Sequence, residues 1–205
     1  MQLKPDNSNL KSTDRSGQGA RSAMPAVKTD SLPRAQIQLP EADIEAIKSI
    51  TRKRDPDLAY SISISSLALL IRHNSLVYRQ AAAWALGIRG EAETASILAT
   101  ALNPRENWMV KREIVNSLGL KLCQTSIDAL KPALKDNSHC VRVAAAKSLG
   151  KLKASSAKTE LASLVKDDSE PIVRGAAIKA LADIERAEQL AQRQNTNSET
   201  GSCSQ

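Results

Sequence analysis

The sequence predicts an all-α solenoid in which short helix pairs repeat along the chain. The first observation is an internal repeat: the line VRVAAAKSLGKL at residues 141–152 recurs as VRGAAIKALADI at residues 173–184. The second is the scarcity of aromatic residues, since the 205 residues include two Trp, two Tyr and no Phe. Ala and Leu at helical spacing let helices pack closely, whereas a β-sandwich or barrel would use more β-branched and aromatic residues.

The chain divides into three regions by composition. Residues 1–39 are polar and basic, with too few apolar residues to line a helix face. Residues 188–205 are also polar and end in QNTNSETGSCSQ. Neither segment buries enough apolar surface to offset the entropy of ordering, so we expect two disordered tails. The solenoid is expected over residues 40–187.

An N-terminal capping helix opens the solenoid. Proline suits the first turn of a helix, and Glu41 and Asp43 would face the positive end of the helix dipole. Proline also disfavours helix in the residue before it, so this helix should end near Asp55, before Pro56.

Four repeat units follow, each centred on a basic residue. The basic residues are spaced by 31 or 32 residues, with Leu seven positions later and Gly or Ala eight positions later. Each unit reads as a first helix, a short polar loop and a second helix, and such a pair must stack on its neighbours to bury its apolar face. The basic residues are Arg79, Lys111, Arg142 and Arg174. The first helices are expected within residues 60–71, 92–102, 126–134 and 157–165.

The second helices sort into columns, counted from the basic residue. Positions −1, +3 and +7 share one face, carry apolar residues and are predicted to be core. Positions +2 and +6 are nearly all small, which lets neighbouring helices approach closely. Position +5 is mostly polar and is predicted to be exposed; its members are Trp84, Asn116, Lys147 and Lys179.

The basic column predicts a structural ladder between repeats. Asp136 lies six residues before Arg142, and Asp168 lies six residues before Arg174. An Asp in the loop can cap the second helix, and the basic residue can pair with an Asp of its own or the next repeat. His73 and Arg105 occupy the acidic position before Arg79 and Lys111, so the ladder is expected to be incomplete at that end.

The segments DNSHCVRVAAAKSLGKL and DSEPIVRGAAIKALADI resemble the HEAT-like repeats of the phycobilisome lyase type, and the resemblance covers residues 60–186. It implies a scaffold linked to phycobilisome biogenesis or turnover, as a component of a phycobilin:phycobiliprotein lyase or as an assembly or degradation factor. The implied partners are phycobiliprotein subunits or a second HEAT-repeat lyase subunit, and the implied cofactor is a transiently bound phycobilin. Deoxyhypusine hydroxylase is a more distant relative whose iron sites need His-Glu pairs, and this sequence has none.

Three functions stay open at this point. The first is a protein-interaction scaffold and the second is a bilin lyase, whose catalysis would depend on positioning and need show no catalytic motif. The third is a general protein- or nucleic-acid-binding scaffold without a role in bilin chemistry. Binding would use the concave face of the second helices, at Trp84, Trp108, Asn116, Lys147 and Lys179.

Several of these residues also have structural interpretations. Trp84 could be a binding anchor or could pack against the capping helix. Trp108 could staple the start of its helix or form a rim contact. The lysines could meet an acidic partner or belong to a solvated face. The net charge of +7 permits nucleic acid, but few aromatics are available to stack bases, which makes it the weaker choice.

The cysteines and histidines indicate neither a disulfide framework nor a metal site. Cys123, Cys140 and Cys203 are odd in number and widely spaced, which favours a reducing, cytoplasmic location. The two histidines have no metal-ligand spacing, and no apolar run is long enough to span a membrane. Cys140 is predicted to be a buried core thiol because the residues in its column are apolar, namely Val77, Met109 and Ile172.

Overall fold

The computed structural model describes residues 39–200 of the chain, with side chains through residue 194, and it confirms the all-α solenoid. Ten α-helices and one 3₁₀ turn, Ser155–Ala157, account for the regular structure of this part of the chain. The helices are α1 Glu41–Lys53, α2 Pro56–Ser61, α3 Ile64–Leu70, α4 Leu76–Ile88, α5 Glu93–Ala101, α6 Trp108–Leu118, α7 Gln124–Ala133, α8 His139–Lys151, α9 Lys158–Asp167 and α10 Pro171–Thr200. The expected N-terminal tail lies outside the described residues except for Leu39.

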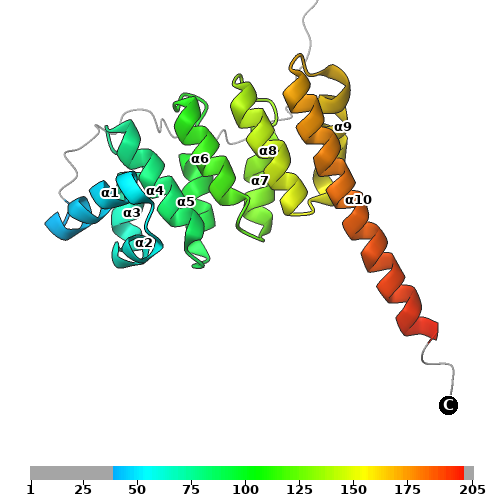
Figure 1. The fold of residues 1–205 in the computed structure, drawn as a ribbon, viewed down its shortest axis with the longest axis horizontal. Helices are drawn as coiled ribbons and strands as arrows, with labels where there is room; N and C mark the ends of the chain where they lie inside the picture. Colours follow the sequence, from blue (N-terminus) through cyan, green and yellow to red (C-terminus); the bar gives the residue numbers. More distant parts are fainter. Residues whose placement is uncertain (1–38, 201–205) are drawn as a thin grey trace, which may run out of the picture. The chain divides into compact units, whose positions relative to one another are not determined.

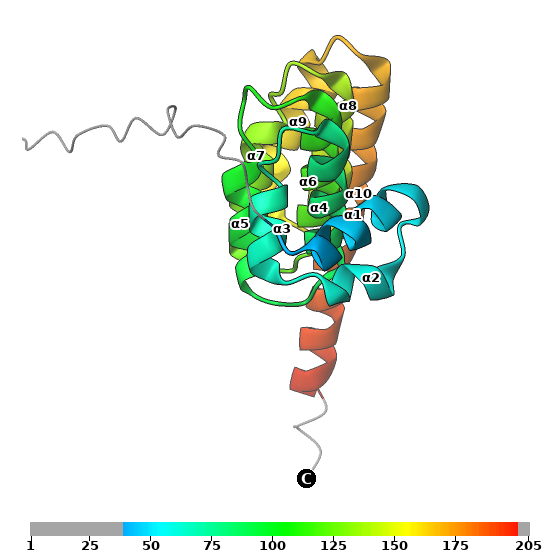
Figure 2. The same cartoon turned by 90° about the vertical axis from the view of Figure 1, so that its left-hand side faces the viewer.

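The helix pairs stack in sequence order. The second helices α4, α6, α8 and α10 lie side by side, each packed on the next (Figure 1). The first helices α5, α7 and α9 form a second layer behind them, as Figure 2 shows from the end of the stack. The core lies between the two layers, where large aliphatic side chains are fully buried. They include Leu98 and Leu130 from the first helices and Ile114, Leu118 and Leu149 from the second helices.

The predicted core column of the second helices is buried in the middle of the stack. In α8, Val141, Ala145 and Leu149 are completely shielded from solvent, and the equivalent residues of α6 are shielded as well. At the two ends of the stack, Tyr78 and Leu181 occupy the same column but are only partly buried. The repeat therefore buries its apolar face by stacking, as a solenoid requires.

Successive second helices interlock through glycine. A Cβ atom placed on Gly87 would lie 2.4 Å from Oγ of Ser117 on the following helix. The Ser117 hydroxyl in turn donates a 2.8 Å hydrogen bond to the carbonyl oxygen of Ala83. The helices can approach this closely only because glycine carries no side chain and because the buried hydroxyl has a partner.

The same contact recurs along the stack. A Cβ on Gly119 would lie 2.4 Å from Oγ of Ser148, and the Ser148 hydroxyl donates to the carbonyl oxygen of Val115 at 3.1 Å. At the next junction Ala180 replaces the serine, and a Cβ on Gly150 would lie 2.8 Å from its Cα atom. The small columns predicted from the sequence are therefore the contact line between second helices.

The N-terminal capping helix forms where the sequence predicts it. α1 begins after Pro40 and packs on α2 and α4, with Ile47 and Ile50 buried beneath it. It ends at Lys53 and is capped by Arg54, whose φ of 49° lies in the left-handed region that closes many helices. Pro56 then starts α2, because proline is well suited to the first turn of a new helix.

The first helix of the first repeat differs from the single helix expected over residues 60–71. The chain leaves the helical conformation at Ile62 and restarts as α3 after Ser63, whose hydroxyl accepts a hydrogen bond from the backbone N–H of Ser66. Serine competes with the helix for backbone hydrogen bonds, which explains the break.

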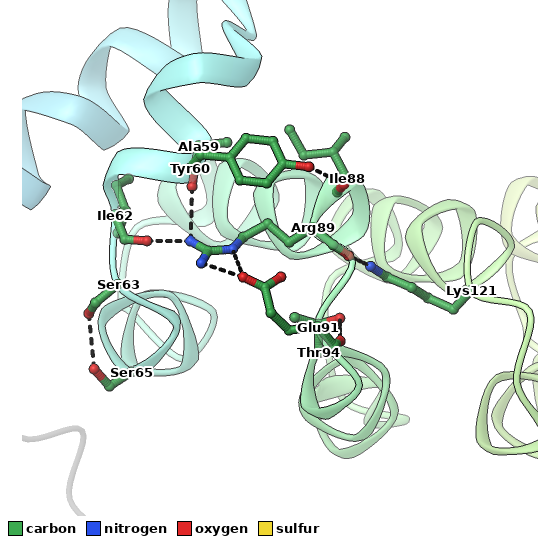
Figure 3. Close-up of polar contacts among 10 residues, drawn as sticks. All are labelled: Ala59, Tyr60, Ile62, Ser63, Ser65, Ile88, Arg89, Glu91, Thr94 and Lys121. Carbon is green, nitrogen blue, oxygen red and sulfur yellow. Dashed lines mark hydrogen bonds and ion pairs between the residues drawn. The ribbon is translucent and has the colours of Figure 1, made fainter.

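The break is held by Arg89, as Figure 3 shows. One terminal nitrogen of its buried guanidinium donates to the carbonyl oxygens of Ala59 and Ile62, at 3.3 and 2.5 Å. The other guanidinium nitrogens donate to the Glu91 carboxylate. Lys121 donates to the Arg89 carbonyl oxygen, and burial lowers the pKa of this lysine. Arg89 thus supplies the hydrogen bonds that the interrupted helix lacks.

The C-terminal segment also differs from expectation, because α10 continues from Pro171 to Thr200 instead of ending near residue 187. Residues 176–200 contain no Gly or Pro, and Ala, Glu, Gln and Arg favour helix. An ion pair between Lys158 and Glu188, 2.9 Å long, also fastens the start of this extension to α9. Helix propensity therefore prevails over the polar composition.

Gly150→Ala tests the interlock. We expect it to lower the free energy of unfolding by about 1–2 kcal/mol, because the new methyl group clashes with the Ala180 backbone. This destabilisation is larger than the stabilisation from the higher helix propensity of alanine. Gly175→Ala is the matched control, since a Cβ at that exposed helical position would meet nothing within 4 Å beyond its chain neighbours and its own helix backbone. The control should raise stability by about 0.5–1 kcal/mol. Urea denaturation measures both, and equal effects of the two substitutions would contradict the interlock.

Candidate binding face of the second helices

An apolar column is exposed on the second helices, close to where each of them begins. Val77 is 50% exposed and Ile172 is 62% exposed, while Met109 and Cys140 at the equivalent positions are half-buried. These residues lie two positions before the basic column. The column is thus most exposed on α4 and α10, the outermost second helices, and less exposed on α6 and α8 between them. Apolar side chains that gather on a surface are typical of an interaction site.

Cys140 is therefore not the buried core thiol expected from its apolar column. Its Sγ atom lies 3.4 Å from Nε2 of His139, at the exposed start of α8. The expectation was wrong because apolar residues fill this column on the solvent side of the helix, seven residues before the polar column at position +5. Seven residues are about two helical turns, so the two columns point in similar directions.

The polar column runs beside the apolar one. Asn116, Lys147 and Lys179 are all exposed. We call the two columns together the second-helix face. Its members are Val77, Met109, Cys140 and Ile172 from the apolar column and Trp84, Asn116, Lys147 and Lys179 from the polar column.

Trp84 differs from the rest of the polar column because it is half-buried and packs against the core. The guanidinium of Arg54, at the end of α1, lies 5.6 Å from the centre of its ring. Arg54 also donates two hydrogen bonds to the Glu113 carboxylate, at 2.7 and 3.1 Å, and this pairing raises the pKa of Arg54. The structure thus places Trp84 under the end of the capping helix.

Glu113 was not predicted as a site residue. It is buried on α6 in the +2 column, where the other repeats carry alanine. The signal was present in the sequence, because a carboxylate in an otherwise small and buried column requires a partner.

Trp108 is the first residue of α6 and is 40% exposed. The guanidinium of Arg112, one turn later, lies 5.4 Å from the centre of its ring. The side chain of Asn107 caps the helix by accepting from the backbone N–H of Met109. Trp108 therefore presents an aromatic and cationic pair to solvent beside the second-helix face.

The basic column forms a ladder between repeats. Arg142 donates to both carboxylate oxygens of Asp168 in the next loop, at 2.7 and 2.9 Å. Its remaining terminal nitrogen donates to the carbonyl oxygens of Asp136 and Asn137 in its own loop. The paired guanidinium lowers the pKa of the Asp168 carboxyl and the pairing raises the pKa of Arg142. Each cation therefore ties its own loop to the following one.

The ladder also includes the first two repeats, which corrects the expectation that it would be incomplete there. Arg79 donates to Glu106 at 2.9 Å, and Lys111 donates to Asp136 at 2.5 Å. Glu106 follows Arg105 directly, so the acid is displaced by one position along the loop. The fixed spacing of six residues does not identify Glu106, although this loop contains Glu106 as a carboxylate.

The ladder stops at the last repeat. Arg174 donates to the carbonyl oxygens of Asp168 and Ser169 in its own loop, at 2.8 and 3.1 Å. This is the arrangement that Arg142 makes with its own loop. Among residues 39–200, no following loop presents a carboxylate to Arg174, because α10 continues as a single helix.

No other feature of the described residues supplies a chemical site. The open hollow between the α7–α8 loop and α9 is lined by Asp136, Arg142 and Asp168, whose charges already belong to the ladder. In this part of the chain, no three His, Cys, Asp or Glu side chains gather as metal ligands. Cys123 precedes α7 with Sγ 3.2 Å from Oγ of Ser126, and Cys203 lies outside the described residues. No helix of residues 39–200 is long and apolar enough to cross a bilayer.

Comparison with known proteins supports a HEAT-like repeat protein. Residues 98–182 match the model of a family described as HEAT repeats. Among solved structures, human deoxyhypusine hydroxylase in complex with glycerol matches with a TM-score of 0.54 and 26% identity over 60% of this chain. The match covers 44% of that enzyme's chain, so this chain spans less than half of its length. No curated protein matches, and neither match concerns phycobilisomes.

Asp168→Asn tests the ladder. It leaves the nearly buried Arg142 charge without a counterion and should lower the free energy of unfolding at pH 7 by about 3 kcal/mol. Because the folded pKa of Asp168 lies below its unfolded value of about 3.9, the pair stabilises the fold above that pH and is lost as the pH falls through the folded pKa. The difference between wild type and variant should therefore shrink on acidification.

Urea denaturation from pH 7 to pH 3 provides the measurement. Asp167→Asn is the matched control, since this neighbour is exposed and only accepts a 3.3 Å hydrogen bond from Ser163. Its effect should stay within about 0.5 kcal/mol. A difference between Asp168→Asn and wild type that did not change with pH would show that the carboxylate charge has no role.

Proposed function

We propose that the chain is a protein-binding scaffold and that it binds through the second-helix face. The observation that carries this proposal is the recurrence of an apolar side chain at the same place on all four second helices, exposed at Val77 and Ile172 and half-buried at Met109 and Cys140. An isolated apolar side chain on a surface is ordinary, but a column repeated along a stack presents several contacts in a line. Trp108 adds an aromatic side chain of the kind enriched at binding hot spots.

The charge beside the apolar column defines the partner's chemistry. Lys147 and Lys179 are exposed and belong to no ion pair among the described residues. The partner surface should therefore combine apolar side chains with acidic ones, so that the lysines steer association and set the register. Trp84 contributes less to this face than the lysines, because it is half-buried and lies beside the Arg54 guanidinium.

Bilin chemistry is the finer function that the resemblance to phycobilisome lyases implies, with a transiently bound phycobilin as cofactor and phycobiliprotein subunits or a second lyase subunit as partners. Only the sequence resemblance supports it. Adding phycocyanobilin to the purified protein, alone and with a phycobiliprotein subunit, tests it directly. A change in the visible spectrum is expected for a lyase, and an unchanged spectrum under both conditions would leave the protein-binding scaffold alone.

Hydroxylation of the deoxyhypusine hydroxylase kind does not fit the residues of this chain. The iron sites implied for that family need His-Glu pairs, whereas His73 is followed by Asn74 and His139 by Cys140. Nδ1 of His73 accepts a hydrogen bond from the backbone N–H of Ser75, which makes this histidine part of a turn. The match with that enzyme therefore supports the fold and not its chemistry.

The double substitution Lys147→Glu with Lys179→Glu tests the proposed face. We expect recovery of specific partners from the native host to fall about tenfold, because like charges would now oppose the acidic partner. The measurement is quantitative mass spectrometry after affinity capture of tagged protein. Both side chains are exposed, so the free energy of unfolding should change by no more than about 1 kcal/mol for the pair.

The control is the double substitution Lys135→Glu with Lys166→Glu, which changes the net charge equally at exposed positions outside the second helices. It should leave partner recovery unchanged. Equal losses from both double variants would show that only the total charge matters. Unchanged recovery from both would place the binding surface elsewhere.

A further inference from the structure

The C-terminal end of the stack exposes a surface that is covered at every earlier repeat. In the +4 column, Ala83, Val115 and Ala146 are fully buried, each beneath the second helix that follows. Ile178 holds the same position on α10 and is 55% exposed. Ala182, which replaces the glycine of the interlock, is exposed as well. The last repeats of solenoids usually carry a polar outer face, whereas this end exposes Ile178 and Ala182.

Arg174 completes this surface with a fixed charge. Its own-loop contacts, to the carbonyl oxygens of Asp168 and Ser169, repeat those that Arg142 makes to Asp136 and Asn137. In Arg142 the nitrogens Nε and Nη2 then bind both carboxylate oxygens of the next loop. In Arg174 the same two nitrogens have no carboxylate partner within residues 39–200.

We propose that this end is a second docking surface, which binds a helix pair of a different protein. That helix pair would present a carboxylate from the loop before its inner helix to Nε and Nη2 of Arg174. It would also place a small side chain against Ala182 and cover Ile178. The proposal extends the inter-repeat contact already present three times in the stack, and it concerns a surface separate from the second-helix face.

A second copy of this chain does not supply the required partner surface. Its first repeat carries His73 and Asn74 in the loop before α4, where a carboxylate is needed. α1 and α2 already pack on α4, so the first helix pair is not available for stacking. A symmetric contact between two C-terminal ends would bring one Arg174 against another, and like charges oppose such a contact. A different protein with an acidic loop is therefore the occupant.

Site-specific photo-crosslinking in the native host tests the proposal. The photoreactive residue p-benzoylphenylalanine replaces Glu185, which is exposed on α10 one turn beyond Ala182. The full chain is used, and the cross-linked peptides are sequenced by mass spectrometry. We expect a peptide from one other protein, in a helix pair with Asp or Glu in the loop before its inner helix.

Variants of the same protein identify the contact. Arg174→Glu should reduce the cross-link about tenfold, whereas Arg174→Lys should keep most of it, because Lys111 already serves as a rung of the ladder. Ala182→Trp should block docking by its size without affecting the fold, because that side chain is exposed. Reversing the partner's acid to Arg should restore the cross-link to Arg174→Glu.

The remaining outcomes would overturn the proposal. They are the absence of a cross-link, a cross-link to a second copy of the chain, and a cross-link that neither Arg174→Glu nor Ala182→Trp weakens. The lysine variants of the second-helix face separate the two surfaces. If Lys147→Glu with Lys179→Glu abolishes partner capture but leaves the Glu185 cross-link intact, each surface binds on its own.

Discussion

The structure depends on the close approach of successive second helices. With no Phe and few other aromatics, the chain builds its core from Leu, Ile and Val together with many Ala residues, and the small Ala side chains fill the space between helices only when the helices nearly touch. Gly87, Gly119 and Gly150 make this approach possible, and Ser117 and Ser148 satisfy their buried hydroxyls across the same line. The approach also brings each loop carboxylate within reach of the preceding cation, so the ladder follows from the packing.

Much of this architecture could be predicted from the repeat alone. The four basic residues, the leucines and the small columns recur at 31 or 32 residues, which specified the helix pairs, their order and the core column. Local chemistry that departs from the repeat could not be read this way. The break at Ile62 is stabilised by Arg89, a residue 27 positions away, and the first rung of the ladder uses Glu106, displaced by one position.

The candidate face was predicted only in part, for a physical reason. Exposed Lys147 and Lys179 follow from the polarity of their column, but the apolar column beside it has the composition of a core. Apolar residues serve both cores and interfaces, so a sequence does not say which side of a helix its neighbours cover. Cys140 shows the difficulty, because its apolar counterparts implied burial whereas the stack leaves this side of α8 open.

The contact between Arg54 and Glu113 has a consequence for how the molecule opens. Arg54 caps the C-terminus of the capping helix, lies over Trp84 of the first repeat and donates two hydrogen bonds to the buried Glu113 carboxylate of the second repeat. One guanidinium thereby joins the cap, the first repeat and the second repeat. If the cap detached, the buried Glu113 carboxylate would lose its counterion. We therefore expect the cap and the first two repeats to unfold together instead of fraying one by one.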